Sequence, residues 1–278
     1  MTPVVPPTPF GNGVWEPVGG GEINHTARVE LDGGRQAFLK WSDEPIAPAL
    51  FHAEERGLGV LRSAVGNHVP KTIDRGDNWL LLAWVEPAPW SPLAWERLGR
   101  VIAALHGFSQ QRFGLDHDNF IGRLPQDNGL SHAWPQFWLE SRIEPMLRQA
   151  RKLGVLDASA AAEVERAAAV VGALVPEEPA RLVHGDLWSG NVLADADEQV
   201  WLVDPAVSYS HRETDLAFMR LFGGFDERAW AAYGELLPIA DGFEERCAGI
   251  QLYPLLVHAL HFGGEYVQRV RSAAAQYL

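Results

Sequence analysis

Apolar and polar residues follow two different periods in the first third of the chain. Residues 15–41 contain the short runs WEPV, INHTARVEL and RQAFLKW, separated by GGGE and DGG, and this pattern predicts a meander of three strands. From Pro48 to Val65 the apolar positions recur at helical spacing, and Glu54 lies in the middle of that apolar stripe. A continuous apolar run, WLLLAWV at 79–85, predicts another buried strand. The first part of the chain therefore predicts a small β-rich unit with one helix.

A proline-rich break, EPAPWSP at 86–92, indicates a hinge between two lobes. The chain beyond it is mainly helical in pattern, and Ser91 followed by proline is typical of a helix start. We therefore predict an α+β fold with a β-rich lobe over residues 1–85 and a helical lobe over residues 86–278. Within the second lobe the pattern predicts a helix from Pro92, an ordered loop over 113–134, an Ala-rich helix over 157–175, and further helices from 226 with a break near Gly263 and Gly264.

The stretch LVHGDLWSGN, residues 182–191, is an apolar run that ends in a polar turn, as strands that lead into functional sites do. It carries Asp186 and, five residues later, Asn191. The next residues, VLADADEQVWLVDP, predict two strands joined by a turn and lead to Asp204. Two carboxylates and an amide are therefore expected to lie close together.

Phosphoryl transfer from a nucleotide uses this set of groups: a carboxylate to orient the acceptor hydroxyl, and an amide oxygen with a second carboxylate to hold magnesium. The order and spacing match a kinase catalytic loop, which predicts Asp186 as the catalytic residue and Asn191 and Asp204 as ligands of Mg²⁺. Gly185 stands where protein kinases have an arginine, and this difference argues against a protein-kinase substrate.

Residues upstream supply the other parts of such a site. Lys40 ends the third predicted strand, the position from which a kinase lysine reaches nucleotide phosphates. A charge on an apolar helix face is costly unless it is paired, so we predict an ion pair between Lys40 and Glu54. The segment GGGEIN at 19–24, with Gly20 and Gly21, lies between the first two strands, where backbone N–H groups can approach phosphate. The sequence therefore predicts ATP as the phosphoryl donor.

The composition limits the partners and the location. The chain has 278 residues and a net charge of −13, which argues against a nucleic-acid or anionic-membrane surface. Its single cysteine, Cys247, excludes an internal disulfide and fits a reducing compartment. The N-terminal MTPVVPPTPF lacks the features of a secretory signal, and no apolar run reaches the roughly 18 residues of a membrane span. We expect a cytoplasmic protein that binds neither nucleic acid nor membrane, and we expect it to be a monomer.

Several segments resemble the fructosamine kinase (ketosamine-3-kinase) family, whose relatives are aminoglycoside and choline kinases. HGDLWSGN at 184–191 contains a pattern that many small-molecule kinases share, whereas its LWSG part and LFGGF at 221–225 are more restrictive. FGLDHDNFIGRLPQDN at 113–128 and FHAEERGLGVL at 51–61 extend the resemblance over nearly the whole chain.

The resemblance implies a two-lobed protein-kinase-like fold with ATP between the lobes. It further implies that backbone groups of Ala83, Trp84 and Val85 meet the adenine, and that Asp186 receives the proton of a ketosamine 3-hydroxyl. The substrate would be a fructosamine or ribulosamine adduct of an amine or of a protein lysine. Trp188, inside the catalytic loop, is expected to line the sugar pocket because an aromatic face packs well on C–H surface.

Other interpretations remain open at this point. A kinase-fold binding protein without chemistry would usually lack one of the catalytic residues, and all of them are present. An aminoglycoside or amino-alcohol kinase is the alternative among enzymes, because an acidic cleft would serve either cationic substrate. A metal-dependent hydrolase would account for the paired aspartates but not for Lys40, Glu54 or the glycine-rich turn.

Four further polar residues favour structural interpretations. We expect His184 to hold the catalytic loop by hydrogen bonds rather than to carry a proton. We expect Asp215 to cap a helix and brace the loop backbone. His258 and His261, one helical turn apart, have no clear third ligand, which favours a helix face over a metal pair.

Overall fold

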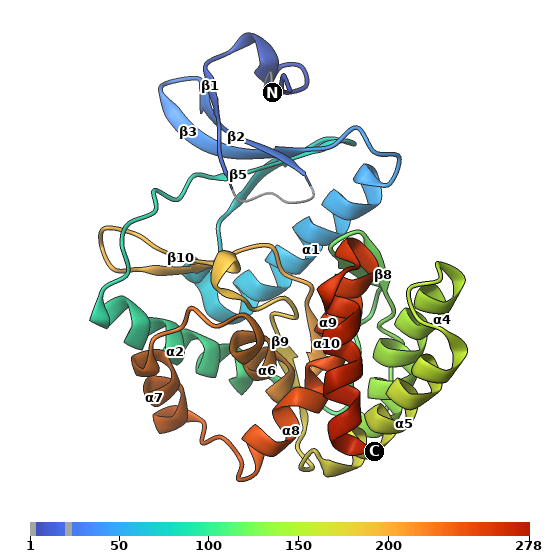
Figure 1. The fold of residues 1–278 in the computed structure, drawn as a ribbon. Coiled ribbons are helices and arrows are strands. Elements are labelled where there is room, and N and C mark those ends of the chain that lie inside the picture. Colours follow the sequence, from blue (N-terminus) through green and yellow to red (C-terminus); the bar gives the residue numbers. More distant parts are fainter. Residues whose placement is uncertain (1–3, 20–23) are drawn as a thin grey trace.

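The computed structural model describes residues 4–19 and 24–278, and it has an antiparallel sheet at the N-terminal end above a larger, mainly helical part (Figure 1). The sheet has five strands in the order β1-β2-β3-β5-β4, and every neighbouring pair is antiparallel. Its strands are β1 Trp15–Pro17, β2 His25–Leu31, β3 Arg35–Trp41, β4 Thr72–Arg75 and β5 Trp79–Ala83.

The alternation of side chains along β3 decides which residues face the rest of the protein. Leu39 and Trp41 point to the outer face of the sheet, where they form a small core with Val29 of β2. Phe38 and Lys40 point to the other face, toward the helical part. The meander predicted over 15–41 is confirmed, and it delivers one lysine to the inner face.

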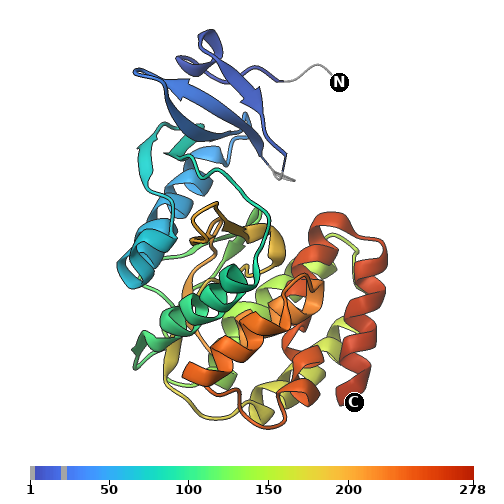
Figure 2. The ribbon, with the colours of Figure 1, turned by 90° about the vertical axis from the view of Figure 1, so that its left-hand side faces the viewer.

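Helix α1, Ala47–Val65, runs from the sheet toward the helical part (Figures 1 and 2). Its apolar stripe, which includes Phe51, Leu58 and Leu61, is buried in a core that continues into the helical part. The helix predicted over 48–65 is therefore confirmed. The boundary at residue 85 stays a prediction, because one hydrophobic core spans both sides of it.

The helical part begins with α2, Pro92–Gly107, where the Ser91 side chain accepts a hydrogen bond from the backbone N–H of Ala94. The Ala-rich helix and the break at Gly263, whose φ is 62°, are found where they were predicted. Trp138–Ile143 is a π-helical turn between α3 and α4. The other helices are α3 Trp134–Phe137, α4 Glu144–Lys152, α5 Ala158–Leu174, α6 Glu213–Phe222, α7 Glu227–Leu236, α8 Phe243–Ile250, α9 Leu252–Phe262 and α10 Glu265–Ala274.

The helical part also contains short strands, which flank its loops. The hairpin predicted after Asn191 is confirmed as β10, Val192–Ala194, paired with β11, Val200–Leu202. The prediction of a loop over 113–134 is wrong in part, because β7 and β8 form a hairpin there. The remaining short strands are β6 Ser109–Gln110, β7 Asn119–Ile121, β8 Leu124–Gln126, β9 Ala180–Val183 and β12 Ser208–Ser210.

Helix length and polarity also bear on membranes. Within residues 4–19 and 24–278, no helix is long and apolar enough to cross a bilayer.

Candidate active site

Lys40 on β3 is held between two carboxylates. Its Nζ lies 2.9 and 3.0 Å from the two carboxylate oxygens of Glu54 on α1, and 2.6 Å from Oδ1 of Asp204. The lysine side chain is 6% exposed and that of Glu54 is 13% exposed, whereas that of Asp204 is 38% exposed. The predicted pair of Lys40 and Glu54 is confirmed. Asp204 is a second partner that the sequence did not indicate.

The local structure explains why these three side chains meet. Lys40 is on the inner face of β3, and Glu54 is on the stripe of α1 that faces this sheet. Asp204 follows β11 and has a φ of 54°, which is an uncommon value for a residue other than glycine. This backbone turn lies at the end of the β10–β11 hairpin and lets the Asp204 carboxylate reach Lys40.

Glu54 and Asp204 share one ammonium group, but their pKa values shift in opposite directions. Burial alone would lower the pKa of Lys40, but Asp204 and Glu54 outweigh it and raise that pKa above its usual range. Burial raises the pKa of Glu54 despite the lysine beside it. The pKa of Asp204 is lowered, because Lys40 outweighs the effect of burial on this carboxylate. Asp204 is therefore the carboxylate of the pair that stays ionised most readily.

Asp186 and Asn191 form a second pair in the turn between β9 and β10. Nδ2 of Asn191 donates to the backbone oxygen of Asp186 at 2.8 Å and to its Oδ2 at 2.9 Å. Burial, with the Asp204 charge next, raises the pKa of Asp186 to about 7. A carboxylate with this pKa is a suitable proton acceptor near neutral pH.

Asp215 braces the backbone just before Asp186. Its Oδ2 accepts the N–H of His184 at 2.7 Å, and its Oδ1 accepts the N–H of Gly185 at 2.9 Å. The predicted bracing role is therefore confirmed. The predicted capping role is wrong, because Asp215 lies inside the first turn of α6 and the cap position is Arg212, without a side-chain capping bond.

His184 is fully buried, and its ring connects the catalytic loop to the segment just before Asp204. Nε2 lies 2.9 Å from the carbonyl oxygen of Val203, and Nδ1 lies 3.3 Å from the backbone nitrogen of Asp186. A carbonyl oxygen only accepts, so Nε2 carries the proton and Nδ1 accepts from Asp186. Burial lowers the pKa of this histidine. These contacts agree with the predicted structural role.

A cleft of about 170 Å³ collects most of the predicted site residues. Its walls come from β3, α1, the hairpin of β7 and β8, the catalytic loop and α9. Six residues that were predicted from the sequence line this cleft together: Lys40, Glu54, Asp186, Trp188, Asn191 and Asp204.

The adenine contacts predicted at Ala83, Trp84 and Val85 stay a prediction. Ala83, Trp84 and Val85 are not among the described residues that line the cleft. The backbone N–H of Ala83 donates to the carbonyl of Lys71 at 2.8 Å, so it is not available to an adenine ring. The Trp84 ring lies near Phe38, with centroids 6.4 Å apart. Gly20 and Gly21 lie outside the described residues.

Ring side chains of α9 form, with Trp188, a wall of the cleft, and the sequence reasoning missed the part from α9. Phe222 of α6 packs against this wall. The ring of His258 lies 4.8 Å from that of Phe222, and the Trp188 ring lies 6.3 Å from Phe222. Phe262 belongs to the same wall and is 51% exposed. The signal was the spacing of His258 and His261 on an apolar helix, which was interpreted as a helix face rather than as part of a substrate site.

The two histidines of α9 use Nδ1 within their own helix. Nδ1 of His258 lies 2.8 Å from the Pro254 oxygen, and Nδ1 of His261 lies 2.9 Å from the Val257 oxygen. Nε2 of His261 accepts the backbone N–H of Arg123 at 3.1 Å. Over the described ranges, no cluster of three or more His, Cys, Asp or Glu side chains could hold a metal ion.

A magnesium ion that is also bound by nucleotide phosphates needs only one or two protein ligands, fewer than a cluster of three side chains. The Nδ2 group of Asn191 is fixed by two acceptors on Asp186, so its Oδ1 is the atom left for coordination. Asp204 supplies an ionised and partly exposed carboxylate in the same cleft. These oxygen donors have the chemistry that Mg²⁺ prefers, and their role as its ligands stays a prediction.

Comparison with known proteins agrees with this geometry. The family model for fructosamine kinase matches residues 6–278. A probable ketoamine kinase of Enterococcus faecium is 35% identical over 265 residues, which cover 93% of each chain. A probable ketoamine kinase of Thermus thermophilus is 38% identical over 252 residues, which cover 90% of this chain and 89% of the relative.

A solved structure shows the same fold. The crystal structure of a Thermobifida fusca protein assigned as a fructosamine-3-kinase superposes with a TM-score of 0.87 at 38% identity, over 95% of this chain and 93% of the other. The predicted α+β, two-lobed protein-kinase-like fold is confirmed, and so is a phosphotransferase activity class. With the matched range running from residue 6 to the last residue, this chain belongs to the fructosamine kinase family.

Proposed function

We propose that this protein is an ATP-dependent kinase that phosphorylates a sugar hydroxyl of ketosamines. The observation that carries the proposal is the meeting of Lys40, Glu54 and Asp204 in the cleft that also contains Asp186 and Asn191. Phosphoryl transfer needs a lysine for the phosphates, oxygen donors for a metal and a carboxylate at the acceptor hydroxyl. Side chains of all three kinds line one cleft, which supports the proposal.

Asp186 acts on the acceptor hydroxyl in this mechanism. Its Oδ2 is bound by Asn191, which orients the carboxylate toward one fixed direction in the cleft. Asp186 accepts the hydroxyl proton while the sugar oxygen forms a bond to the γ-phosphorus of ATP and the bond from that phosphorus to the ADP oxygen breaks. A pKa of about 7 keeps a large fraction of Asp186 ionised at neutral pH.

Lys40 positions the phosphates of ATP, and Glu54 holds Lys40 in place. Glu54 does so through both carboxylate oxygens, which fixes the direction of the ammonium group. Asp204 and Asn191 are the residues that would hold Mg²⁺. When it is bound, this ion neutralises charge on the phosphates.

The choice of a ketosamine rests on the family and on the aromatic wall. The relatives are named probable ketoamine kinases, and the wall of Trp188, His258 and Phe262 offers ring faces to the C–H surface of a sugar. We propose the 3-hydroxyl as the acceptor and a glycated amine or a glycated protein lysine as the substrate. The 3-phosphorylated product is unstable and releases the amine, so the reaction would remove the sugar adduct.

The test is a substrate panel with purified protein, ATP and magnesium. Fructosyl-lysine and ribulosyl-lysine are compared with an aminoglycoside and with choline, and the products are followed by phosphorus NMR and by ADP release. We expect phosphorylation of at least one ketosamine, and we expect none from the Asp186→Asn variant. Phosphorylation of an aminoglycoside or choline with every ketosamine untouched would overturn the substrate and leave the kinase activity standing.

A further inference from the structure

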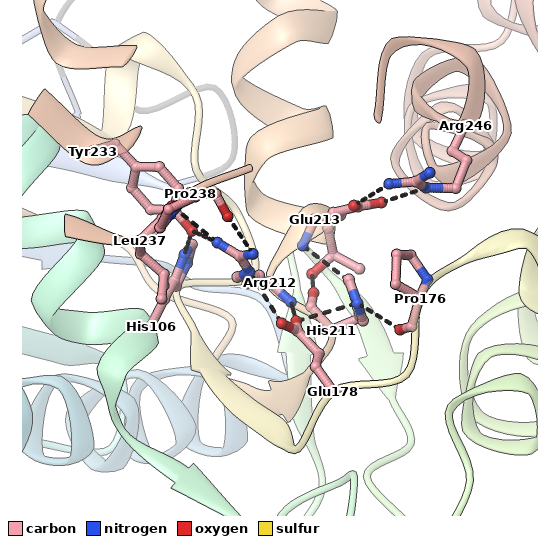
Figure 3. Close-up of polar contacts among 11 residues, drawn as sticks. His106, Pro176, Glu178, His211, Arg212, Glu213, Tyr233, Leu237, Pro238 and Arg246 are labelled. Carbon is pink, nitrogen blue, oxygen red and sulfur yellow. Dashed lines mark hydrogen bonds and ion pairs between the residues drawn. The ribbon is translucent and has the colours of Figure 1, made fainter. Parts of the chain in front are cut away.

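A chain of buried hydrogen bonds runs behind the catalytic loop. Arg212 Nη1 lies 3.2 Å from the hydroxyl oxygen of Tyr233, and that oxygen lies 2.9 Å from Nδ1 of His106 (Figure 3). Nε2 of His106 lies 3.1 Å from Oδ2 of Asp215. Asp215 in turn accepts the N–H of His184 and the N–H of the next residue, which directly precedes Asp186. The chain therefore links α7 to the catalytic loop through α2 and α6.

Each hydrogen bond in this chain has one direction. The Asp215 carboxylate only accepts, so Nε2 of His106 carries the proton and Nδ1 of a neutral imidazole is an acceptor. Tyr233 must then donate its O–H to Nδ1, and its oxygen can accept from Arg212. Burial raises the pKa of Tyr233 above its usual range, so the hydroxyl keeps its proton. The tyrosine therefore selects the histidine tautomer that donates to Asp215.

Arg212 makes four further hydrogen bonds, to Glu178, Leu237 and Pro238, so it holds the far end of the hydrogen-bond chain rigidly. Its Nε lies 3.0 Å from Oε2 of Glu178, and its remaining N–H groups donate to the carbonyl oxygens of Leu237 at 3.1 Å and Pro238 at 2.6 Å (Figure 3). Its backbone N–H donates to Oε1 of Glu178 at 3.1 Å. Glu178 also contacts His211, the residue before Arg212, at 3.2 Å.

None of these side chains can touch a substrate in the cleft. His106 is 0% exposed, Tyr233 is 1% exposed and Arg212 is 9% exposed. All three are described residues, and none of them lines the cleft. An effect on turnover would therefore have to pass through Asp215 and the loop backbone. Without the Tyr233 hydroxyl, Nδ1 of His106 would be a buried acceptor without its donor, and such a loss costs enough to shift the network.

We propose that Tyr233, held by Arg212, is a positioning residue for phosphoryl transfer. By fixing His106 in the tautomer with the proton on Nε2, it keeps Asp215 on the two loop N–H groups and so fixes the place of Asp186. This inference rests on the proposed function for its kinetic part. Its structural part, the ordering of the loop by Tyr233, stands apart from the identity of the substrate.

The kinetic test is Tyr233→Phe, which removes one hydroxyl and keeps the ring. We expect kcat to fall about tenfold, while KM for ATP and for the ketosamine changes less than about twofold, because the binding groups are untouched. Tyr277→Phe is the matched control. That hydroxyl also bridges two partners, donating to the Glu245 oxygen at 2.6 Å and accepting the Gly249 N–H at 3.0 Å, but it has no link to the loop. We expect the control variant to keep wild-type kcat.

Amide hydrogen exchange tests the same inference without any substrate. In Tyr233→Phe, the N–H groups of His184 and Gly185 should exchange at least about tenfold faster than in the wild type, whereas Tyr277→Phe should leave them unchanged. If Tyr233→Phe is poorly folded, Arg212→Lys gives a second route: it keeps the charge and loses the fork of donors, and exchange at the same two amides should rise.

The outcomes separate the two proposals. A wild-type protein that phosphorylates no ketosamine contradicts the proposed function, and the exchange measurement then still decides the role of Tyr233. Wild-type exchange at both loop amides in Tyr233→Phe, with a kcat equal to that of the Tyr277→Phe control, would overturn the inference. The inference is also overturned if the fall in kcat is fully accounted for by a smaller folded fraction in the thermal unfolding curve. That result would indicate a structural role alone.

Discussion

Nζ of Lys40 lies 2.6 Å from Oδ1 of Asp204, although 164 positions separate the two residues along the chain. This contact joins the inner face of the N-terminal sheet to the end of the β10–β11 hairpin, across the cleft. Glu54 holds the same ammonium group from α1. The lysine that we assign to the phosphates is thus shared between a carboxylate that fixes it and a carboxylate that we assign to the metal.

The first prediction concerns this shared lysine. Lys40→Met should lower kcat/KM for ATP about 100-fold or more, since a buried charge that pairs with two carboxylates is lost. Glu54→Gln should lower it less, about tenfold, because Asp204 still holds the lysine. Steady-state kinetics at varied ATP measures both. The free energy of unfolding of Lys40→Met should fall by less than about 3–5 kcal/mol, the usual cost of breaking a buried pair, because the raised pKa of Glu54 lets it take a proton.

Turnover like that of the wild type in Lys40→Met, at low and at saturating ATP, would show that another group binds the phosphates. Arg35→Met is the matched control. It removes an exposed cation from the first residue of the same strand, and it should leave the kinetics unchanged.

The second prediction concerns pH and activity. Asp186 works as a proton acceptor only when it is ionised, and its pKa is raised to about 7. Below that pH the protonated fraction grows, so kcat/KM should fall about tenfold per pH unit. Asp186→Asn should lower kcat by roughly 10²–10⁴-fold, the contribution typical of general base catalysis, with ATP binding nearly retained. A flat profile of kcat/KM between pH 5.5 and pH 8, about 1.5 units below and one unit above this pKa, would contradict the assignment.

The same pKa has a consequence for stability, which forms the third prediction. The pKa of Asp186 is about 7 in the folded protein against 3.8 as the ordinary value, so between these values the folded state binds more protons than the unfolded state. Stability from this group is present at low pH and is lost as pH rises through about 7. Asp186→Asn, which carries no charge, should therefore have a higher Tm than the wild type at pH 8. Thermal unfolding at pH 8 and pH 5 measures the difference, which should be smaller at pH 5. A lower Tm for the variant at pH 8 would show that the folded protein does not raise the pKa of Asp186 as we expect.

The fourth prediction concerns the metal. Asn191→Ala should raise the magnesium concentration for half-maximal activity at least about tenfold, and it should also lower kcat because Asp186 loses two hydrogen bonds. Asp204→Asn should shift the magnesium dependence without removing those bonds. Asp197→Asn is the matched control, since this exposed carboxylate lies in the turn of the same hairpin. Equal magnesium titrations for all three variants and the wild type would exclude Asn191 and Asp204 as ligands.

Much of the site could be predicted because its residues are tied to local pattern. Lys40 is at the end of an alternating strand, and Glu54 interrupts an apolar helical stripe. A buried charge at either position is costly unless an opposite charge pairs with it. Asp186 and Asn191 are only five residues apart, so their contact is local. The contact of Asp204 with Lys40 depends instead on how the two parts of the chain pack, and on a positive φ at an aspartate that no pattern indicates.

The missed parts of the fold have their own physical reason. The β7–β8 hairpin carries buried polar residues instead of alternating apolar ones: Nδ2 of Asn119 donates to the Val207 oxygen and Nε2 of Gln126 donates to the Ala206 oxygen. Hydrophobic periodicity cannot detect a strand that is stabilised by such contacts. Strand β4 is a short edge strand whose register shifts between Thr72 and Asp74, which removes its alternation.

The backbone of the catalytic loop explains the glycine that replaces the arginine of protein kinases. Gly185 has a φ of 83°, a region that favours glycine, and an added Cβ would lie 2.0 Å from the carbonyl oxygen of Ala206. Ala206 is two residues after Asp204, and its own N–H donates to the His184 oxygen at 2.9 Å. The loop with Asp186 and the segment with Asp204 therefore approach each other so closely that a side chain at position 185 does not fit.

The fifth prediction follows from this close approach. Gly185→Ala must either push the Ala206 carbonyl away or turn the loop, and both changes move Asp186 relative to Asp204, so kcat should fall about 100-fold. The strain should also lower the free energy of unfolding by about 1–3 kcal/mol. Gly59→Ala is the matched control: this glycine is within α1, no atom lies within 4 Å of its added Cβ, and alanine there should add about 0.5–1 kcal/mol of stability with kcat unchanged. Kinetics and urea unfolding of the two variants measure both effects. Wild-type kcat in Gly185→Ala would mean that the loop can shift without moving Asp186, and the close packing of the two segments would then not be what aligns the site.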